Sequence, residues 1–206
     1  MAIITELYHL PALEYFVAIQ DYDIVYLDIE EDYQKQTYRN RTQIRLANKV
    51  ETLSIPVIGG NKKVKSSQIR IDNSQKWKNV HLRGIQSAYG KAPYFEFYFP
   101  YFEPVYNQKW DLLADFNHAL LTVCLKMIQS KTKLQILDYS DDLKEFNDFR
   151  GVIQTKKSFE CRNIYSPVPY QQLFGLDFVP NLSIIDLLFC MGPETANILN
   201  QSQKKQ

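Results

Sequence analysis

Residues 2–29 read AIITELYHLPALEYFVAIQDYDIVYLDI, and this stretch decides the fold class of the chain. Residues 2–9 and 23–29 are apolar runs of strand length, and residues 12–20 have the pattern of a short helix. A strand, a helix and a strand with short joints form a βαβ unit, which favours a parallel pair with a right-handed crossover. We therefore predict an α/β protein whose mixed β-sheet opens with this unit and carries helices packed on it.

The rest of the chain continues to alternate strands and helices, without an internal repeat or a linker-like boundary. Strands are predicted at residues 50–60, 66–72 and 133–139, and helices at 77–88, 111–128, 141–149, 183–192 and 193–200. The aromatic stretch at 92–106 is interpreted as a loop packed in the core, and residues 150–181 show no period. We predict one domain over residues 1–200 and a disordered tail at 201–206.

Composition limits the classes of function that the chain can serve. The 206 residues carry a formal net charge of +1, so no global field would hold nucleic acid or an anionic membrane. The N-terminus lacks the basic region of a signal peptide, and no apolar run approaches the ~18 residues of a membrane helix. Three widely spaced cysteines suit reduced thiols, so we expect a cytoplasmic protein that does not contact a membrane.

The motifs of several common enzyme classes are absent from the sequence. Its seven glycines form neither a G-x-G-x-x-G fingerprint nor a Walker loop, and no G-x-S-x-G elbow occurs. The three histidines lie far apart and lack the spacing of zinc ligands. We therefore expect neither a metal nor a cofactor.

Residues 33–46, YQKQTYRNRTQIRL, contain four cations and no acidic residue. The cations are Lys35, Arg39, Arg41 and Arg45. All four are odd-numbered, so an extended strand would place them on one face. Guanidinium forks match phosphate oxygens, and the first three cations are therefore our candidate phosphate site. The alternative is a solvated outer strand whose cations pair with the acidic residues 30–32.

His9 ends the first predicted strand, and Asp28 ends the second. Ligands of open α/β sheets bind in the crevice outside the carboxyl ends of the strands. The two side chains could meet at that rim, where they would form a general acid or base with an orienting carboxylate. The alternative is a histidine that only caps a loop.

Two further polar residues lie on predicted helices. Asn117 falls on the apolar stripe of the helix at 111–128, where an amide without a partner would cost about 1–3 kcal/mol. It either bonds to backbone in the core or lines a ligand cavity as a third catalytic candidate. Asp186 follows Ser183 at the spacing of a capping box, which is a structural role.

Several separate blocks of the sequence together resemble the WbqC-like protein family. They are YQKQTYRNR (33–41), LSIPV (53–57), W-x-x-x-H (77–81), A-Y-x-x-A-P-Y-F (88–95), F-N (116–117) and N-L-S-I-I-D-L-L-F-x-x-G (181–192). The resemblance runs from about His9 to Gly192, although the glutamine of the family's His-Gln-Pro opening is replaced by leucine here. Within these blocks Tyr33, Asn40 and Tyr94 are further candidates for ligand contact.

The family is associated with gene clusters for bacterial O-antigen and other surface polysaccharides. The resemblance implies a transferase that moves an acyl or aminoacyl group, such as glycyl, to an amino sugar of a nucleotide sugar. His9 would deprotonate the attacking amine, and Asn117 or a backbone N–H would stabilise the oxyanion. The expected partners are a sugar nucleotide and an acyl donor, with an aminoacyl-tRNA as one option.

Two other classes of function are compatible with the sequence. The first is a non-catalytic protein that binds a sugar nucleotide or a partner of the same pathway. The second is a nucleotidyltransferase or another phosphate-handling transferase, which a two-metal carboxylate cluster would support.

Overall fold

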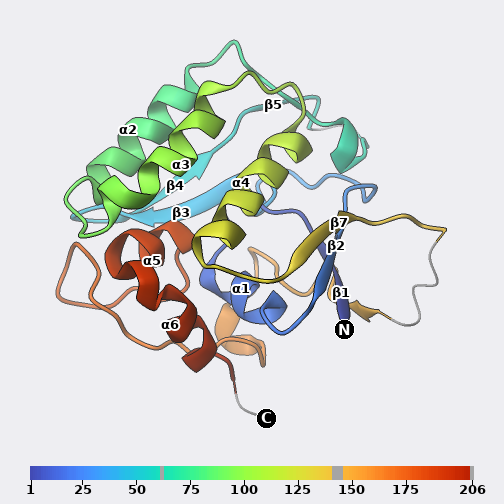
Figure 1. Ribbon diagram of the computed structural model, residues 1–206. Helices are drawn as coiled ribbons and strands as arrows, with labels where there is room; N and C mark the ends of the chain where they lie inside the picture. Colours follow the sequence, from blue (N-terminus) through green and yellow to red (C-terminus); the bar gives the residue numbers. More distant parts are fainter. Residues whose placement is uncertain (61–62, 141–145, 205–206) are drawn as a thin grey trace.

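The computed structural model describes residues 1–60, 63–140 and 146–204 and has the α/β class expected from the sequence (Figure 1). The opening βαβ unit is confirmed: β1 (Ala2–Glu6), α1 (Leu13–Ile19) and β2 (Ile24–Asp28) follow in that order. The two strands pair in parallel, with Ala2 opposite Ile24 and Glu6 opposite Asp28. Both strands are mainly apolar and mostly buried, and each ends in a carboxylate, Glu6 in β1 and Asp28 in β2.

Two more strands complete the main sheet in the order β7-β2-β1-β8. Strand β7 (Lys133–Ile136) pairs in parallel with β2, and β8 (Asn147–Asp148) pairs in parallel with β1. The described part of this sheet is therefore parallel. Antiparallel pairing occurs in two separate ribbons, which join β3 (Arg41–Arg45) to β4 (Val50–Ser54) and β5 (Val57–Ile58) to β6 (Arg70–Ile71).

Five longer elements supply the helical layers. They are α2 (Trp77–Tyr89), α3 (Phe95–Asn107), α4 (Leu113–Met127), α5 (Ile184–Met191) and α6 (Thr195–Gln201). Short 3-10 turns occupy Ser66–Gln68, Phe159–Cys161 and Gly192–Glu194. Figure 1 shows α2, α3 and α4 beside one another, with α2 lying over the β3–β4 hairpin.

The core is centred on α5, which is hydrophobic on all sides and packs against α2, α3 and α4. Seven of its eight residues are buried, and a helix that is apolar all round belongs in a core. Its one carboxylate, Asp186, accepts hydrogen bonds from the Tyr170 hydroxyl at 2.6 Å and the Gln172 amide at 3.0 Å. Burial raises the pKa of Asp186, and its carboxylate joins this network in place of the expected capping box with Ser183.

Residues 150–181 form mostly irregular structure, which explains their lack of sequence period. Buried charge holds them to the body of the protein. Arg162 donates two parallel hydrogen bonds of 2.6 Å to the fully buried Glu14 of α1. Arg45 donates to the carbonyl of Asp177 at 2.6 Å. The paired hydrogen bonds from Arg162 to Glu14 fix the orientation of the guanidinium as well as its distance.

The structure corrects several expected elements. The aromatic stretch at 92–106 is largely helix α3, with Pro100 and Pro104 inside it, and not a loop. The helix expected at 141–149 falls partly outside the described residues, and its later part is strand β8. Residues 202–204, expected in a disordered tail, are ordered: Ser202 is buried, and Gln203 bridges to Tyr165.

No helix within residues 1–60, 63–140 and 146–204 combines the length and the hydrophobicity needed to cross a bilayer.

Candidate functional site

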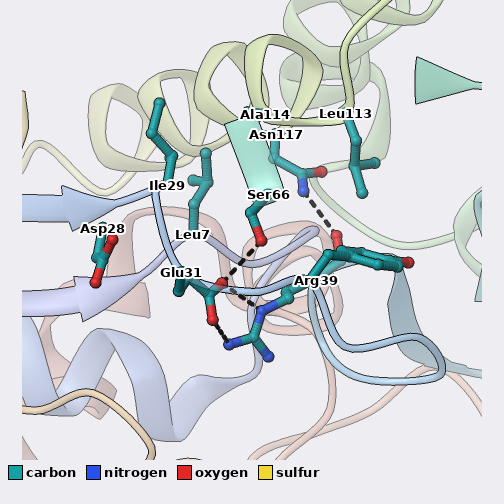
Figure 2. A pocket seen from close by; sticks show the side chains of 10 residues that line it. Leu7, Asp28, Ile29, Glu31, Arg39, Ser66, Leu113, Ala114 and Asn117 are labelled. Atoms are coloured by element: carbon teal, nitrogen blue, oxygen red, sulfur yellow. Dashed lines mark hydrogen bonds and ion pairs between the residues drawn. The ribbon is translucent and has the colours of Figure 1, made fainter. Parts of the chain in front are cut away.

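The strongest concentration of buried charge lies just beyond the carboxyl ends of β1 and β2. Arg39, only 6% exposed, stands on the loop that leads into β3, and it reaches two carboxylates. Its Nε and Nη2 both donate to Glu31, which also accepts a 3.0 Å hydrogen bond from the Ser66 hydroxyl. Figure 2 shows Glu31 held between Ser66 and the Arg39 guanidinium.

The second carboxylate is Glu6, the last residue of β1. Its Oε1 accepts from Arg39 Nη2 at 3.3 Å and from the backbone N–H of Gly151 at 2.8 Å. Its Oε2 accepts from the hydroxyl of Tyr8 at 3.0 Å. Burial and the negative charge of Glu6 raise the pKa of Tyr8 well above its ordinary value. Burial likewise raises the pKa of Glu31.

This arrangement corrects the expected role of the 33–46 stretch. Only residues 41–45 form a strand, so the four cations do not share one face. Gln36 has a φ of 61°, which turns the chain back on itself, and Lys35 is exposed at that turn. The guanidinium fork of Arg39 is largely occupied by protein carboxylates, and its Nη1 donates a longer hydrogen bond of 3.4 Å to the Thr37 hydroxyl.

Open space at Arg39 lies on one side only. On the side drawn in Figure 2, between the end of β2 and α4, the enclosed volume is about 10 Å³, which is room for about one water. On the other side Arg39, Glu6 and Tyr8 line a cavity of about 210 Å³. A ligand can therefore meet Arg39 only from the second side.

The 210 Å³ cavity is polar and has aromatic walls. Besides the three residues just named, it is lined by Gln34, Thr37, Tyr38, Gly151, Ile153, Gln154, Thr155 and Lys156. Aromatic rings with amides, hydroxyls, one carboxylate and one guanidinium suit a molecule with many hydroxyl groups, because each hydroxyl can find a donor or an acceptor. We call this space the Arg39 cavity.

A second cavity of about 140 Å³ adjoins the first. Tyr38 and Thr155 line both spaces, and Arg41 lines the second. The Nε of Arg41 is buried and has no hydrogen-bond partner among the described residues. Arg41 therefore retains the donor capacity that Arg39 has given to Glu31.

His9 lies in a different environment from the one expected. Strand β1 ends at Glu6, and the chain turns at Leu10, whose φ is 39°. The imidazole is 0% exposed and packs against the rings of His81 and Phe116, at centroid distances of 5.6 and 5.7 Å. Burial lowers the pKa of His9 well below its ordinary value, so this imidazole is neutral at pH 7.

The expected pairing of His9 with Asp28 does not form. Asp28 is buried at the end of β2 and accepts hydrogen bonds from Tyr139 at 2.7 Å and Arg150 at 2.9 Å. The nearest partner of His9 is instead Asn117, at 3.2 Å from its Nδ1. The reason is geometric: His9 lies three residues past the strand end, on the side of α4.

Asn117 resolves the alternatives left open by the sequence. Its amide Nδ2 donates to the carbonyl of Arg39 at 2.7 Å, and its Oδ1 faces His9. The residue borders only the small enclosed space beside Arg39. It thus fixes the backbone that carries Arg39.

Three remaining candidates occupy separate places. Tyr33 lines the enclosed space, and burial raises the pKa of its hydroxyl to about 12. Asn40 donates to the carbonyl of Ile55 at 3.0 Å and lies beside the hairpin. Tyr94 begins α3 and packs on Gly192 at the end of α5. The structure does not place Tyr94 in the Arg39 cavity.

Sequence reasoning missed Glu6 and Tyr8, which line the Arg39 cavity. Glu6 was read as one residue of an apolar strand, although a carboxylate facing the core side of a strand needs a partner. That rule was the available signal. Gly151 and Lys156 belong to a stretch without period, and nothing local in the sequence connects them to β1.

No group of three or more histidine, cysteine, aspartate or glutamate side chains within the described ranges could hold a metal ion.

Comparison with known proteins places the chain in a family. The family model described as "WbqC-like protein family" matches residues 8–168 and 153–198. A protein of Mycobacterium tuberculosis (strain ATCC 25618 / H37Rv) named "Uncharacterized protein Rv1507c" is 24% identical over 220 residues, covering 93% of this chain and 94% of that protein. No solved structure gives a significant match. Because the family model spans most of the sequence, the chain belongs to the WbqC-like protein family.

Proposed function

We propose that the protein is a transferase that moves an acyl or aminoacyl group to the amino sugar of a nucleotide sugar. The resemblance to a family of O-antigen and surface-polysaccharide gene clusters implies this reaction. The observation that carries the proposal is a pair of cavities that share Tyr38 and Thr155, with Glu6 and Arg39 lining the first and Arg41 lining the second.

The Arg39 cavity receives the sugar in this proposal. Tyr38 offers a ring face, while Gln34, Thr37 and Gln154 offer hydrogen-bond groups for sugar hydroxyls. The guanidinium of Arg39, held by Glu31, is already oriented and loses little freedom on binding.

The phosphates extend toward Arg41. Its unpartnered Nε and the adjoining hydroxyl of Thr52 can each donate to phosphate oxygens, whereas the Thr42 hydroxyl already donates to the carbonyl of Leu10 at 2.8 Å. Arg41 replaces Arg39 as the main phosphate ligand, because the protein's own carboxylates occupy most of the Arg39 fork.

Glu6 serves as the base in place of His9, whose burial keeps it from a substrate. The amine nitrogen of the sugar attacks the acyl carbon of the donor, and its proton passes to Glu6. The carbonyl then re-forms as the bond to the donor's leaving group breaks, and the leaving group takes up the proton. A positioned base contributes typically 10²–10⁴-fold to such a reaction.

The proposal is tested by incubating the protein with dTDP- or UDP-linked amino sugars and with acetyl-CoA or glycyl-tRNA as the donor. Mass spectrometry detects the product. The expected product is the nucleotide amino sugar increased by the mass of the acyl group. Glu6→Gln should keep binding and lower turnover by roughly 10²–10⁴-fold. Glu103→Gln, on the exposed side of α3, is the matched control.

The alternative is a sugar-nucleotide binding protein without catalysis, and the burial of His9 favours it. Binding of a sugar nucleotide without a product from any of these donors would support that alternative.

A further inference from the structure

A larger cavity, of about 530 Å³, lies between helix α2 and the β3–β4 hairpin. We call it the hairpin cavity. Its walls are mainly apolar and include Leu53, Pro56, Val57 and Val80, with the ring of Trp77 among them. Small-molecule sites typically have volumes of 300–1,000 Å³ and mostly apolar walls. The hairpin cavity has the size and the lining of such a site, and apart from Arg41 and Thr52 its lining residues take no part in the proposed transfer reaction.

Polar groups without partners gather at the same place. The indole Nε1 of Trp77 and the side-chain Oδ1 of Asn40 are both buried, and neither has a hydrogen-bond partner among the described residues. The two residues are 4% and 8% exposed. Arg41, which also lines the cavity, adds its unpartnered Nε. Leaving a buried donor or acceptor unpaired is costly, so such groups mark places where another molecule completes the bonding.

The available groups define the chemistry of that molecule. Trp77 and Arg41 both present N–H donors, and Lys76 adds a second cation at the cavity wall. The carboxylate of Glu51, which also lines the cavity, is paired with Lys49. Donors and uncompensated cations together favour an acceptor that bears negative charge, while the apolar walls favour a flat hydrocarbon body.

The fold keeps this space defined. Helix α2 approaches the hairpin most closely at Gly84, where an added Cβ would lie 3.2 Å from Leu53 Cδ2. His81 on the same helix bonds to the carbonyl of Ser54 at 3.0 Å and fixes the two elements together. These contacts hold α2 against the hairpin at one side of the cavity.

We propose that the hairpin cavity binds a small organic acid with a flat apolar body, its carboxylate held by Trp77 Nε1 and Arg41. The proposal requires neither a sugar nucleotide nor turnover, but it shares Arg41 with the phosphate site of the proposed transferase function. Arg41 and Thr52 line both this cavity and the one that adjoins the Arg39 cavity, so occupancy of one can influence the other.

The chain contains two tryptophans, which provide a reporter and an internal control. The indole N–H of Trp110 is already bonded to the carbonyl of Val105 at 2.7 Å, whereas that of Trp77 is unpartnered. In ¹H–¹⁵N correlation spectra the Trp110→Phe variant lacks the Trp110 indole cross-peak, which assigns both peaks. Titration of the full chain with 2-naphthoate should shift the Trp77 peak saturably and leave the Trp110 peak in place.

Two comparisons make the test specific. The uncharged 2-naphthalenemethanol has the same rings and should bind at least fivefold more weakly. Val80→Glu places a negative charge at the cavity wall, and the fold should tolerate it because Val80 is 62% exposed. This variant should bind 2-naphthoate at least fivefold more weakly than wild type. Ser87→Glu, exposed on the same helix outside the cavity lining, should bind like wild type.

Three results would overturn the proposal. The first is a Trp77 peak that does not move at millimolar 2-naphthoate. The second is an equal shift of both indole peaks, and the third is equal binding of the acid and the alcohol or of wild type and Val80→Glu.

Discussion

Asn117 on α4 donates a hydrogen bond of 2.7 Å to the backbone carbonyl of Arg39, and its other side-chain atom faces Nδ1 of His9 at 3.2 Å. Since the amide oxygen can only accept, the neutral imidazole of His9 carries its proton on Nδ1. One side chain thus connects the turn after β1 to the loop that carries the buried arginine. Asn117 thereby positions the backbone of Arg39 without contacting a substrate.

Asn117→Ala should destabilise the protein by about 1–3 kcal/mol, because it leaves the Arg39 carbonyl and His9 Nδ1 buried without partners. Urea unfolding monitored by circular dichroism measures the loss. Asn79→Ala on the exposed face of α2 should change stability by no more than about 0.5 kcal/mol. Equal losses in the two variants would show that the Asn117 bonds contribute nothing specific.

Arg39→Lys should also be destabilising, although charge is kept. An ammonium group cannot give two parallel bonds to Glu31 and still reach Glu6 in the same geometry. We expect a loss of about 1.5–3 kcal/mol, the usual magnitude for hydrogen bonds to charged groups. Arg83→Lys on the exposed side of α2 is the control in the same denaturation experiment. A stability equal to wild type would mean that the fork geometry at Arg39 is unimportant.

The stability of the protein should fall as pH drops below 6.5. Burial lowers the pKa of His81 from 6.5 to about 4, so the fold favours the neutral imidazole. Between these two pH values the unfolded chain binds more protons than the fold. The contribution of His81 is therefore complete above pH 6.5 and is lost as pH falls toward about 4.

Urea unfolding at pH 7, 6, 5 and 4.5 checks this dependence. His81→Gln cannot titrate there, so its stability should fall less steeply than that of wild type over the same range. Asn79→Gln, on the exposed face of α2, should keep the wild-type slope. A His81→Gln slope equal to wild type would contradict the assigned role.

Gly192→Ala should cost more stability than Gly59→Ala. Both glycines have positive φ, 54° and 76°, and the ψ of −121° at Gly192 lies outside the left-handed helical region that other residues can adopt. At Gly192, however, an added Cβ would lie 2.5 Å from the ring of Tyr94, whereas nothing lies within 4 Å at Gly59. The difference in melting temperature between the two variants reports the cost of moving Tyr94 together with the backbone strain at Gly192. No difference would show that the ring shifts freely.

The sequence predicts those parts of the fold whose signals are local. The βαβ opening follows from apolar periodicity over residues 2–29, and α2 follows from the stripe that includes Trp77 and His81. Helix α3 was missed because Pro100 and Pro104 suggest a break, yet the chain continues as a helix around them. Rules based on neighbouring residues do not predict the secondary structure of a segment whose packing partners are distant in the sequence.

The candidate site depends on contacts that local reasoning does not supply. Arg39 was singled out correctly as a notable cation, but its partners Glu6 and Glu31 are joined to it only by the tertiary fold. The prediction that His9 lies at the carboxyl-end rim of the sheet was wrong, because the chain turns at Leu10, which has a positive φ. Spacing along a strand cannot predict such a turn when the residue is not glycine.

Calorimetric titration of Arg41→Gln against wild type with dTDP- and UDP-linked sugars tests the central claim most directly. Arg83→Gln is the matched control, because it also removes one arginine charge but at an exposed position of α2. The account predicts saturable binding to wild type and Arg83→Gln, and binding weakened at least tenfold in Arg41→Gln, since a charged hydrogen bond to phosphate contributes about 1.5–3 kcal/mol. Equal affinity of Arg41→Gln and wild type, or no binding of any sugar nucleotide to the wild-type protein, would contradict it.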